Sequence, residues 1–256
     1  MTTDPNTKLF MYGIIGFCVG IFFFIMGFVW LRRKRLIENT PTSKIRSVAM
    51  GLVEIYGEIE AVPDKVYKTP FTDKDCVYYS YSVQEYRGGK NAHWETLESK
   101  EVRDLFYLKD ETGRVLINPA KAAIEITTTT TIESGMGKDP PENIMAFLNK
   151  EGIKHDGWFG INKKMRFVEY YMSPKDKLYI LGTAAENTNT GYKSLSGTKD
   201  STVIEKGQDE KYFLISEKSE KQILKSLKIW SIAGIYGGAA LSLACLAIIL
   251  AYIGLF

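Results

Sequence analysis

The chain has 256 residues, of which 45% are hydrophobic and 25% are charged, and its formal net charge is +3. The positive charge is concentrated beside two long apolar segments, because residues 47–216 contain 22 Lys and Arg against 26 Asp and Glu. No basic stripe therefore remains for nucleic acid. The three cysteines, two of them inside apolar segments, exclude a secreted disulfide scaffold and a multi-cysteine zinc site.

The first predicted element is a membrane-spanning helix at residues 9–31, after an N-terminal tail of residues 1–8. The segment holds no charged residue, and it exceeds the roughly 20 apolar residues that cross about 30 Å of hydrocarbon. A cleavable signal peptide is the alternative, but its apolar core would run only about 7–15 residues behind a basic start. Here the core is longer and the positive charge follows it, so we expect a retained anchor.

A basic cluster follows this segment, and a second cluster precedes another uncharged apolar stretch at residues 229–256, the second predicted span. Basic residues within about 15–20 residues of a span stay on the cytoplasmic side. We therefore expect a multi-pass protein of the cell membrane, with residues 32–228 in the cytoplasm and both termini outside. Near the surface, each Lys or Arg also attracts anionic headgroups by roughly 1 kcal/mol. The membrane-proximal basic residues are Arg32, Arg33, Lys34, Arg35, Lys225 and Lys228.

Between the spans, a short amphipathic helix is predicted at residues 41–50. Thr40 suits the N-cap, Pro41 the first helical position, and Gly51 the position just past the C-terminus. Beyond Gly51, apolar and polar residues alternate through residue 61, which is typical of a half-buried strand. A helix that leads directly into a strand indicates the start of a folded domain and not a flexible linker.

β-branched and aromatic runs predict most of the remaining domain as strands. We expect strands at residues 76–86, 93–95, 105–119 (a hairpin), 122–132, 165–172, 178–185 and 211–216. One helix is predicted at residues 140–152, with Pro at its start and Gly at its end, and residues 186–206 are expected to form a long mobile loop. Ser219 and Gln222 match a capping box that opens the second membrane helix. The sequence thus predicts a membrane protein in which two transmembrane α-helices flank a β-rich α+β soluble domain.

No catalytic constellation stands out in the sequence. Cys76 could form a nucleophile–base pair with His93 or His155, but it heads a strand without a local signature, so a buried structural thiol is favoured. The run from Asp110 to Gly113 is not a contiguous Asp-Thr-Gly and has no second copy, which favours a solvent-facing turn over an aspartic-protease motif. The sequence also has no Gly-rich phosphate loop and no metal-spaced His/Cys cluster. We therefore expect no catalytic, cofactor-binding or metal-binding residues, and no cofactor.

Both apolar segments carry small residues four positions apart. Gly16 and Gly20 share one helix face in the first segment, as Gly234 and Gly238 do in the second. Such spacing permits the close approach of helices, so the two spans are expected to pack together or to dimerise. Neither span contains a charged side chain, which argues against transport of ions or protons.

The order of several short motifs resembles the GIDE-type, or beside-a-membrane (BAM), domain family. A basic stop after a span is followed by PTSKIR, GLVE, a further glycine, CVYY and F-x-L-x-D-x-T-G-x-V-x-I-x-P. The resemblance covers nearly the whole chain, including the second span. The family-motif residues are Pro41, Thr42, Ser43, Lys44, Gly51, Glu54, Gly57, Cys76, Tyr78, Asp110, Thr112, Gly113 and Pro119.

The resemblance implies a relation to membrane-embedded E3 ubiquitin ligases, whose eukaryotic members carry a RING finger after the second span. This sequence ends at Phe256 inside that span, and a RING finger needs about eight zinc ligands, mostly cysteine. We therefore expect the sensing or substrate-binding domain of the family without its ligase chemistry. In the mitochondrial relatives this domain faces the intermembrane space, whereas the basic clusters here favour the cytoplasm.

These observations lead to three hypotheses for function. The first is a membrane-anchored binding or scaffolding module, whose exposed aromatic residues Tyr78, Tyr86 and Trp158 contact a protein partner. The second is an enzymatic role, either within a ubiquitin-like ligase system or through Cys76. The third is a membrane-organising homo-oligomer built on the glycine faces of the spans.

Overall fold

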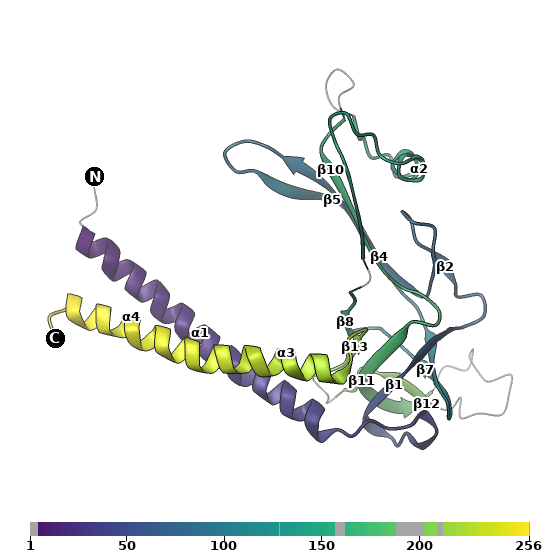
Figure 1. Ribbon diagram of the computed structural model, residues 1–256, viewed down its shortest axis with the longest axis horizontal. Coiled ribbons are helices and arrows are strands. Elements are labelled where there is room, and N and C mark those ends of the chain that lie inside the picture. Colours follow the sequence, from purple (N-terminus) through teal and green to yellow (C-terminus); the bar gives the residue numbers. More distant parts are fainter. Residues whose placement is uncertain (1–4, 128, 157–161, 188–201, 209–211, 256) are drawn as a thin grey trace. The chain divides into compact units, whose positions relative to one another are not determined.

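The computed structural model describes residues 5–127, 129–156, 162–187, 202–208 and 212–255 (Figure 1). The chain divides into two compact units. One unit consists of residues 1–41 and 219–256, and its described part is mainly helical. The other consists of residues 42–218, and its described part is built mainly from strands.

Two long helical segments lie side by side in the helical unit. Helix α1 (Pro5–Asn39) forms the first segment. The second segment starts with helix α3 (Glu220–Ile232), passes through a π-helical turn (Ala233–Gly237) and continues as helix α4 (Gly238–Tyr252). A capping box opens α3 as predicted, because the Ser219 N–H donates to Gln222 Oε1 at 3.0 Å.

Both helical segments are long and apolar enough to cross a membrane. Only 11% and 17% of their apolar windows are buried, whereas the core helix of a soluble protein is mostly buried. Helix α1 continues beyond the predicted span and through the basic cluster, because Arg, Lys and Leu are good helix formers. An ion pair one turn apart supports this end of the helix, with 2.5 Å between Lys34 Nζ and Glu38 Oε1.

The β-rich unit contains a small barrel of five strands. Pairing runs from β1 through β6, β7 and β12 to β11, and β11 pairs again with β1, which closes the ring. Closure pairs the backbone groups that an open sheet would present at its edges. The barrel strands, four of which are labelled close together in Figure 1, are β1 (Gly51–Ala61), β6 (Phe106–Asp110), β7 (Gly113–Ile117), β12 (Thr202–Glu205) and β11 (Lys177–Glu186).

Apolar side chains from alternate positions fill the barrel. In β1, Val53, Ile55 and Ile59 are buried while Tyr56 and Glu58 are exposed, which confirms the predicted alternation at these positions. Glu54, predicted on the polar face, is an exception because it is fully buried. Most of the core residues are β-branched or aromatic, the types that pack well on a pleated surface. The core also includes Phe106, Leu108, Val115, Ile117, Leu178, Ile180, Ile204, Phe213 and Ile215.

Two short strands extend the barrel sheet from β11. Strand β13 (Leu214–Ser216) pairs with β11 in antiparallel fashion, and β8 (Ala123–Glu125) pairs in parallel with β13. Strand β13 is the last strand before α3, and it pairs with β11, which in turn pairs with β1. The chain therefore leaves the β-rich unit beside β11.

A second, antiparallel sheet has the strand order β5–β4–β10–β9. Helix α2 (Glu142–Glu151) packs against it through Ile144 and Leu148, together with the buried Phe71. Gly152 ends this helix in the left-handed conformation, as predicted, with a φ of 69°. The strands of the sheet and the short ribbon that precedes β4 are β5 (His93–Arg103), β4 (Tyr78–Arg87), β10 (Met165–Met172), β9 (Thr129–Ser134), β2 (Tyr67–Lys68) and β3 (Asp75–Cys76).

The predicted amphipathic helix at residues 41–50 is wrong. This stretch is fully described and forms only a 3₁₀ turn at Ile45–Ser47. The backbone N–H groups of Ile45 and Arg46, which would bond within such a helix, donate instead to Asp110 and Thr112 at the β6–β7 turn. Thr40 is not an N-cap, because its hydroxyl donates to the Leu36 carbonyl at 2.8 Å, at the C-terminal end of α1.

Further predictions also have different bounds in the structure, among them the strand expected at residues 93–95, which runs to Arg103 as β5. The single strand expected at residues 122–132 is two strands, β8 in the barrel sheet and β9 in the second sheet. The last strand, expected at residues 211–216, is β13 and spans Leu214–Ser216 in the described part of the chain. The loop expected at residues 186–206 ends in strand β12, and residues 188–201 lie outside the described residues.

Candidate functional site

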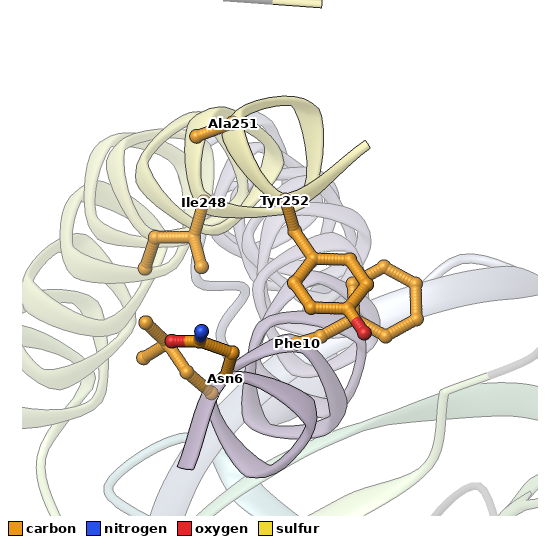
Figure 2. A pocket seen from close by; sticks show the side chains of 6 residues that line it. Asn6, Phe10, Ile248, Ala251 and Tyr252 are labelled. Carbon is orange, nitrogen blue, oxygen red and sulfur yellow. The ribbon is translucent and has the colours of Figure 1, made fainter. Parts of the chain in front are cut away.

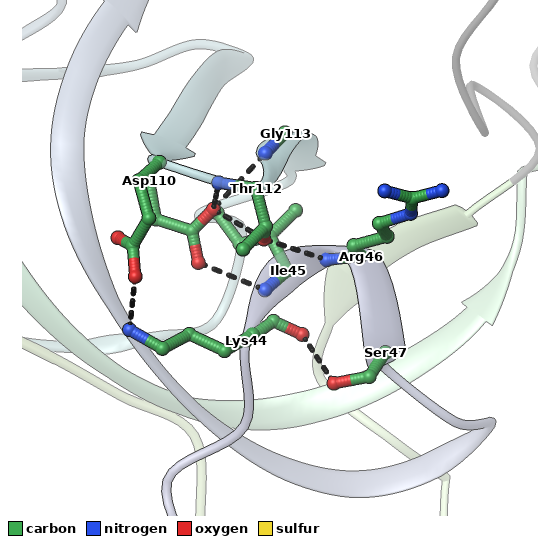
Figure 3. A network of polar contacts seen from close by, with 8 residues as sticks. Lys44, Ile45, Arg46, Ser47, Asp110, Thr112 and Gly113 are labelled. Carbon is green, nitrogen blue, oxygen red and sulfur yellow. Dashed lines mark hydrogen bonds and ion pairs between the residues drawn. The ribbon is translucent and has the colours of Figure 1, made fainter.

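Two of the sequence motifs meet at the turn between β6 and β7 (Figure 3). One is the PTSKIR segment before β1, and the other is the motif that contains Asp110, Thr112 and Gly113. Thr42 forms a parallel bridge with Glu54 of β1, and the Ser43 N–H donates to the Glu54 carbonyl at 2.7 Å. The next residues then pass the β6–β7 turn, where the Ile45 N–H donates to Asp110 Oδ2 at 3.0 Å. The segment before β1 and the β6–β7 turn, about 65 positions apart in the chain, are therefore in direct contact.

Asp110 is the centre of this network. Its Oδ1 accepts hydrogen bonds from the Thr112 N–H at 2.7 Å, the Thr112 hydroxyl at 2.6 Å and the Gly113 N–H at 3.0 Å. The Thr112 hydroxyl in turn accepts from the Arg46 N–H at 3.1 Å. Burial opposes ionisation of Asp110, but the hydrogen bonds from Ile45, Thr112 and Gly113 outweigh it and lower the pKa of the carboxyl below its ordinary value. Asp110 is thus held as a charged acceptor at neutral pH.

An exposed ion pair lies beside this network. Lys44 Nζ donates to Glu111 Oε1, and the two side chains are 63% and 67% exposed. Their hydrogen bond lowers the pKa of Glu111 and raises that of Lys44. Ion pairs in contact with solvent contribute little to stability, so the geometry of the turn depends on Asp110 and not on Glu111.

Glu54 forms a second anchor, in the wall of the barrel. Its fully buried carboxyl group accepts from the Thr42 hydroxyl at 2.6 Å and from the Tyr179 hydroxyl at 2.8 Å. These bonds compensate for the burial of the polar group and join the segment before β1 to strand β11. The family motif includes Thr42 and Glu54 but not Tyr179, whose position within the predicted strand at residues 178–185 was its only sequence signal.

A surface cavity of about 410 Å³ opens next to Asp110. Its lining includes Gly57, which lies so close to the Lys109 carbonyl that a Cβ would overlap it. The charges of the lining are mixed, and Lys177 Nζ lies 3.9 Å from Glu58 Oε1. Among the residues that the structure describes, the lining includes no cysteine, serine or histidine.

Cys76 lies in a structural environment. It is fully buried, and its thiol donates to the Tyr67 carbonyl at 3.5 Å. Burial first, and nearby carboxylates second, raise the pKa of the thiol to about 12. The two histidines make other contacts in the described part of the chain: His93 Nδ1 lies 2.9 Å from the Asn91 carbonyl, and the backbone carbonyl of His155 accepts a hydrogen bond in a loop.

We expect Cys76 of the folded chain to resist alkylation. Because its pKa is raised from 9.0 to about 12, the thiolate fraction at pH 8 falls about a thousandfold. Iodoacetamide treatment, followed peptide by peptide by mass spectrometry, should leave Cys76 unmodified until the chain is denatured. The same peptide labelled in urea is the control, and rapid labelling of the native chain would contradict the structure.

The aromatic residues expected to contact a partner differ in exposure. Tyr78 was expected to be exposed, and this is wrong: it is 5% exposed, and its hydroxyl donates to Glu101 Oε1 at 2.6 Å. Tyr86 is 37% exposed at the end of β4. Trp158 lies outside the described residues. Tyr86 is therefore the one member of this set that the structure places at the surface.

The remaining motif residues lie at the ends of elements. Gly51 begins β1 with a φ of 109°, in a region of backbone conformation that favours glycine. Pro119 follows β7, and its carbonyl accepts from the Ala122 N–H at 3.1 Å. Pro41 is the last residue before the β-rich unit.

In the helical unit, glycines allow the two helical segments to approach closely. A Cβ at Gly20 would lie 2.7 Å from the Ser242 nitrogen, and one at Gly238 would lie 2.5 Å from the Phe24 nitrogen. Real Cβ atoms do not come so close to a backbone. Gly27 lies in the same contact but was not predicted, because neither Phe23 nor Leu31, four positions away on each side, is a small residue. The predicted glycines in this contact are Gly16, Gly20, Gly234 and Gly238.

The two helical segments run antiparallel, so the start of α1 and the end of α4 lie at the same end of the helical unit, where Figure 2 shows Phe10 beside Tyr252. At this end the rings of Phe10 and Tyr252 stack with their centroids 4.4 Å apart. At the opposite end the rings of Trp30 and Trp230 lie 5.8 Å apart. A cavity of about 440 Å³ opens between the helices beside Asn6 and is otherwise lined by apolar and aromatic side chains.

The membrane-proximal basic residues lie on the helices toward the end with the two tryptophans. Arg32 and Arg35 on α1 and Lys225 and Lys228 on α3 are exposed, whereas Arg33 and Lys34 are half-buried. Among the described residues, no group of three His, Cys, Asp or Glu is arranged to hold a metal ion.

The fold and the site define a class of protein. In the sequence, one apolar helical segment precedes and another follows a β-rich unit that contains a small barrel. A family model described as GIDE, E3 ubiquitin ligase, matches residues 78–250. Because this match covers well over half of the chain, the chain belongs to the GIDE family, as the motifs indicated. No curated protein and no solved structure matches the chain.

Proposed function

We propose that this chain is a membrane-anchored binding or scaffolding module, which holds its β-rich unit at the membrane surface. The observation that carries the proposal is the presence of two exposed apolar helices of membrane-spanning length, one on each side of a compact β-rich unit in the sequence. In water, exposed apolar surface costs about 25 cal/mol per Å², and insertion into lipid removes this cost.

The lengths of the two connections support a position close to the bilayer. Helix α1 ends at Asn39, and the Thr42 hydroxyl is already bonded to Glu54 of β1. On the other side, β13 ends at Ser216 and α3 begins at Glu220. An extended chain spans at most about 3.3–3.6 Å per residue, so links of two or three residues allow the β-rich unit little freedom to leave the membrane surface.

The charges support a cytoplasmic position for the β-rich unit. The exposed basic side chains of α1 and α3 lie toward the end of the helical unit that is opposite to the start of α1 and the end of α4. Basic residues next to spans favour the cytoplasmic side. Under this proposal both termini lie outside, in the cell membrane.

A binding role agrees with the contacts of the motif residues, which stabilise the fold. Asp110 and Glu54 serve as hydrogen-bond acceptors within the fold, and Cys76 is buried with a raised pKa. None of the three is free to act on a substrate. The motif residues described here therefore support the shape of the unit, and binding falls to its surface.

A cluster of aromatic and cationic side chains supports a protein partner. The rings of Tyr86 and Trp94 meet edge to face at 5.4 Å. The Arg166 guanidinium lies 4.4 Å from the Trp94 ring, and Lys164 Nζ lies 4.8 Å from the Tyr86 ring. Trp, Tyr and Arg are the residues most enriched among the strong contributors to protein interfaces.

Membrane extraction and protease protection of the full chain, tagged at both ends, test this proposal. The chain should stay in the membrane pellet after alkaline carbonate treatment, which strips peripheral proteins. In intact cells, added protease should remove both tags and leave residues 42–218 protected. Release by carbonate would overturn the anchoring, and digestion of residues 42–218 in intact cells would overturn the cytoplasmic position.

The family description favours a second candidate, a part in a ubiquitin-like ligase system. In this case the β-rich unit would bind the substrate or the modifier, because the buried thiol of Cys76 is poorly suited to carry it. Conjugation in a reconstituted system should then survive the Cys76→Ala change. Loss of conjugation in a Cys76→Ala variant that folds normally would favour cysteine chemistry instead.

A further inference from the structure

The two outer strands of the second sheet differ in how they are protected against further pairing. The strand order is β5–β4–β10–β9, so β5 and β9 each have a neighbour on one side only. The free side of such a strand presents a row of backbone N–H and C=O groups, to which another strand can bond. Natural proteins protect these edges with bulges, charged side chains or proline, so an edge without such protection is open to pairing.

Strand β5 carries two of these protective features. Its register against β4 shifts between Val83 and Gln84, because Leu97 is an extra residue of β5 that is paired with no residue of β4. Such a bulge bends and twists the edge of a sheet. The strand is also rich in charge, and its charged residues include Glu95, Glu98, Lys100, Glu101 and Arg103. The β5 edge is therefore protected.

Strand β9 is almost without such protection. Its pairing with β10 runs without a register shift, and its sequence, TTTIES, has no proline and a single charged side chain, Glu133. Threonine and isoleucine make up four of its six residues, and both types favour strands. Within the described residues, no backbone hydrogen bond joins the free side of β9 to another segment. The β9 edge is therefore open.

The two faces of β9 restrict the register in which a second copy of the same strand can pair with it. Thr129, Thr131 and Glu133 are exposed on one face, whereas Ile132 packs on the other face, against the core beneath α2. Residues that lie directly opposite each other in an antiparallel pair point to the same face of the sheet. Two copies related by a two-fold axis therefore match their faces when the pairing is centred on Thr131 or on Ile132. Either register pairs all but one residue of the strand.

The single charge of β9 is compatible with both registers. When the pairing is centred on Thr131, Glu133 lies opposite Thr129 of the second copy, and when it is centred on Ile132, Glu133 lies opposite Thr131 of the second copy. Like charges directly opposite each other are destabilising, whereas pairs of hydroxyl side chains are favourable. Neither register places the two Glu133 carboxylates opposite each other, so the strand is complementary to itself.

We propose that β9 pairs in antiparallel orientation with β9 of a second copy of this chain, which joins the two four-stranded sheets into one continuous sheet. Each copy contributes one open edge of this sheet, so the association closes after two copies. The outer strands of the joined sheet are then both β5, whose edge is protected. A second copy is favoured over a strand of another protein, because self-pairing leaves no open edge in this sheet and opposes no like charges. The proposal rests on the β-rich unit and does not depend on membrane anchoring.

Cross-linking of the full chain in detergent micelles tests this pairing. With Cys18 and Cys245 changed to serine, Thr131→Cys should be cross-linked between two chains by a short bismaleimide. In the two registers, residue 131 lies directly opposite its copy or on the diagonal at about 7–8 Å, and the reagent spans both distances. Ser99→Cys, exposed on β5 at the other edge of the sheet, is the matched control and should give no cross-link between chains. Equal yields at the two positions, or no cross-link at Thr131→Cys, would overturn the proposal.

Charge variants and the mass of the particle, measured by light scattering after size exclusion, sharpen the test. The parent chain should be a dimer. Thr131→Lys combined with Glu133→Lys places lysines opposite each other in both registers, and it should raise the dissociation constant of the dimer about tenfold or more. Thr96→Lys combined with Ser99→Lys, at exposed positions of β5, is the control and should remain a dimer. Near-UV circular dichroism confirms that each variant is folded. A monomeric parent chain, or a dimer that is equally stable in the two variants, would overturn β9 as the interface.

Discussion

Replacing Asp110 by alanine is expected to lower the free energy of unfolding of the β-rich unit by about 1–3 kcal/mol. The change removes the acceptor for the N–H groups of Ile45, Thr112 and Gly113, which donate to the carboxylate at 2.7–3.0 Å. It also releases the segment before β1 from the β6–β7 turn. Urea unfolding of the full chain in detergent, followed by intrinsic fluorescence, measures the effect.

Glu111→Ala is the matched control on the same turn. Glu111 is exposed and pairs with the equally exposed Lys44, so its removal should leave the unfolding midpoint nearly unchanged. Equal effects of Asp110→Ala and Glu111→Ala would show that the hydrogen bonds to Asp110 do not hold the turn.

The same carboxylate should make stability depend on pH. The pKa of Asp110 in the folded chain is below its ordinary value of 3.8, so its contribution is fully present above that value. It is lost as the pH falls through the lower pKa of the folded state. As the pH falls below about 4 toward the lower pKa of the folded state, the parent chain should therefore lose more stability than an Asp110→Asn variant. Parallel stability curves for the two chains would contradict this role.

Local patterns in the sequence were sufficient to predict individual strands. The alternation of Val53, Ile55 and Ile59 with Tyr56 and Glu58 predicted β1, because the side chains of a strand point to opposite faces in turn. Closure of the barrel was not predictable in this way. It depends on the parallel pairing of β7 with β12 and on the pairing of β1 with β11, which join segments far apart in the chain.

The failed helix at residues 41–50 has a specific cause. Its local signals were real, but tertiary hydrogen bonds to Asp110 and Thr112 compete for the backbone N–H groups of Ile45 and Arg46 and prevail. Short helices are marginal on their own, so two or three long-range bonds suffice to replace one. Similarly, β-branching predicted extended backbone at residues 122–132 but held no information on the two sheets that this stretch joins.

The candidate site was predicted in part. The motifs identified Thr42, Glu54 and Asp110, but not which of them would meet, because contacts between distant residues leave no local pattern. Tyr179 was missed for the same reason. The exposure of Tyr78 was predicted wrongly, because alternation in a strand does not reveal which side chain a neighbouring strand will cover, and here Glu101 of β5 binds the hydroxyl.

The second large effect is expected in the helical unit, where Gly238→Leu should separate the two helical segments. A Cβ at Gly238 would lie 2.5 Å from the Phe24 nitrogen and 2.7 Å from the Gly20 carbonyl oxygen. Backbone atoms cannot move aside as the end of a side chain can, so the whole segment must shift. Overpacking of this kind costs about 1–3 kcal/mol, and each 1.4 kcal/mol reduces the population of the packed form about tenfold.

Gly237→Leu is the control for this change, because no atom lies within 4 Å of a Cβ at Gly237. Both variants replace a glycine by leucine at adjacent positions, so they alter helix propensity equally and differ only in what the new side chain meets. Cysteines introduced at Phe10 and Tyr252, with Cys18 and Cys245 changed to serine, allow a short bismaleimide to report on the packing in membranes. Gly238→Leu should lower the yield of the cross-link within one chain, and Gly237→Leu should not. Equal yields would contradict the packing of the helical unit, and a cross-link formed mainly between two chains would show that the glycine faces serve dimerisation instead.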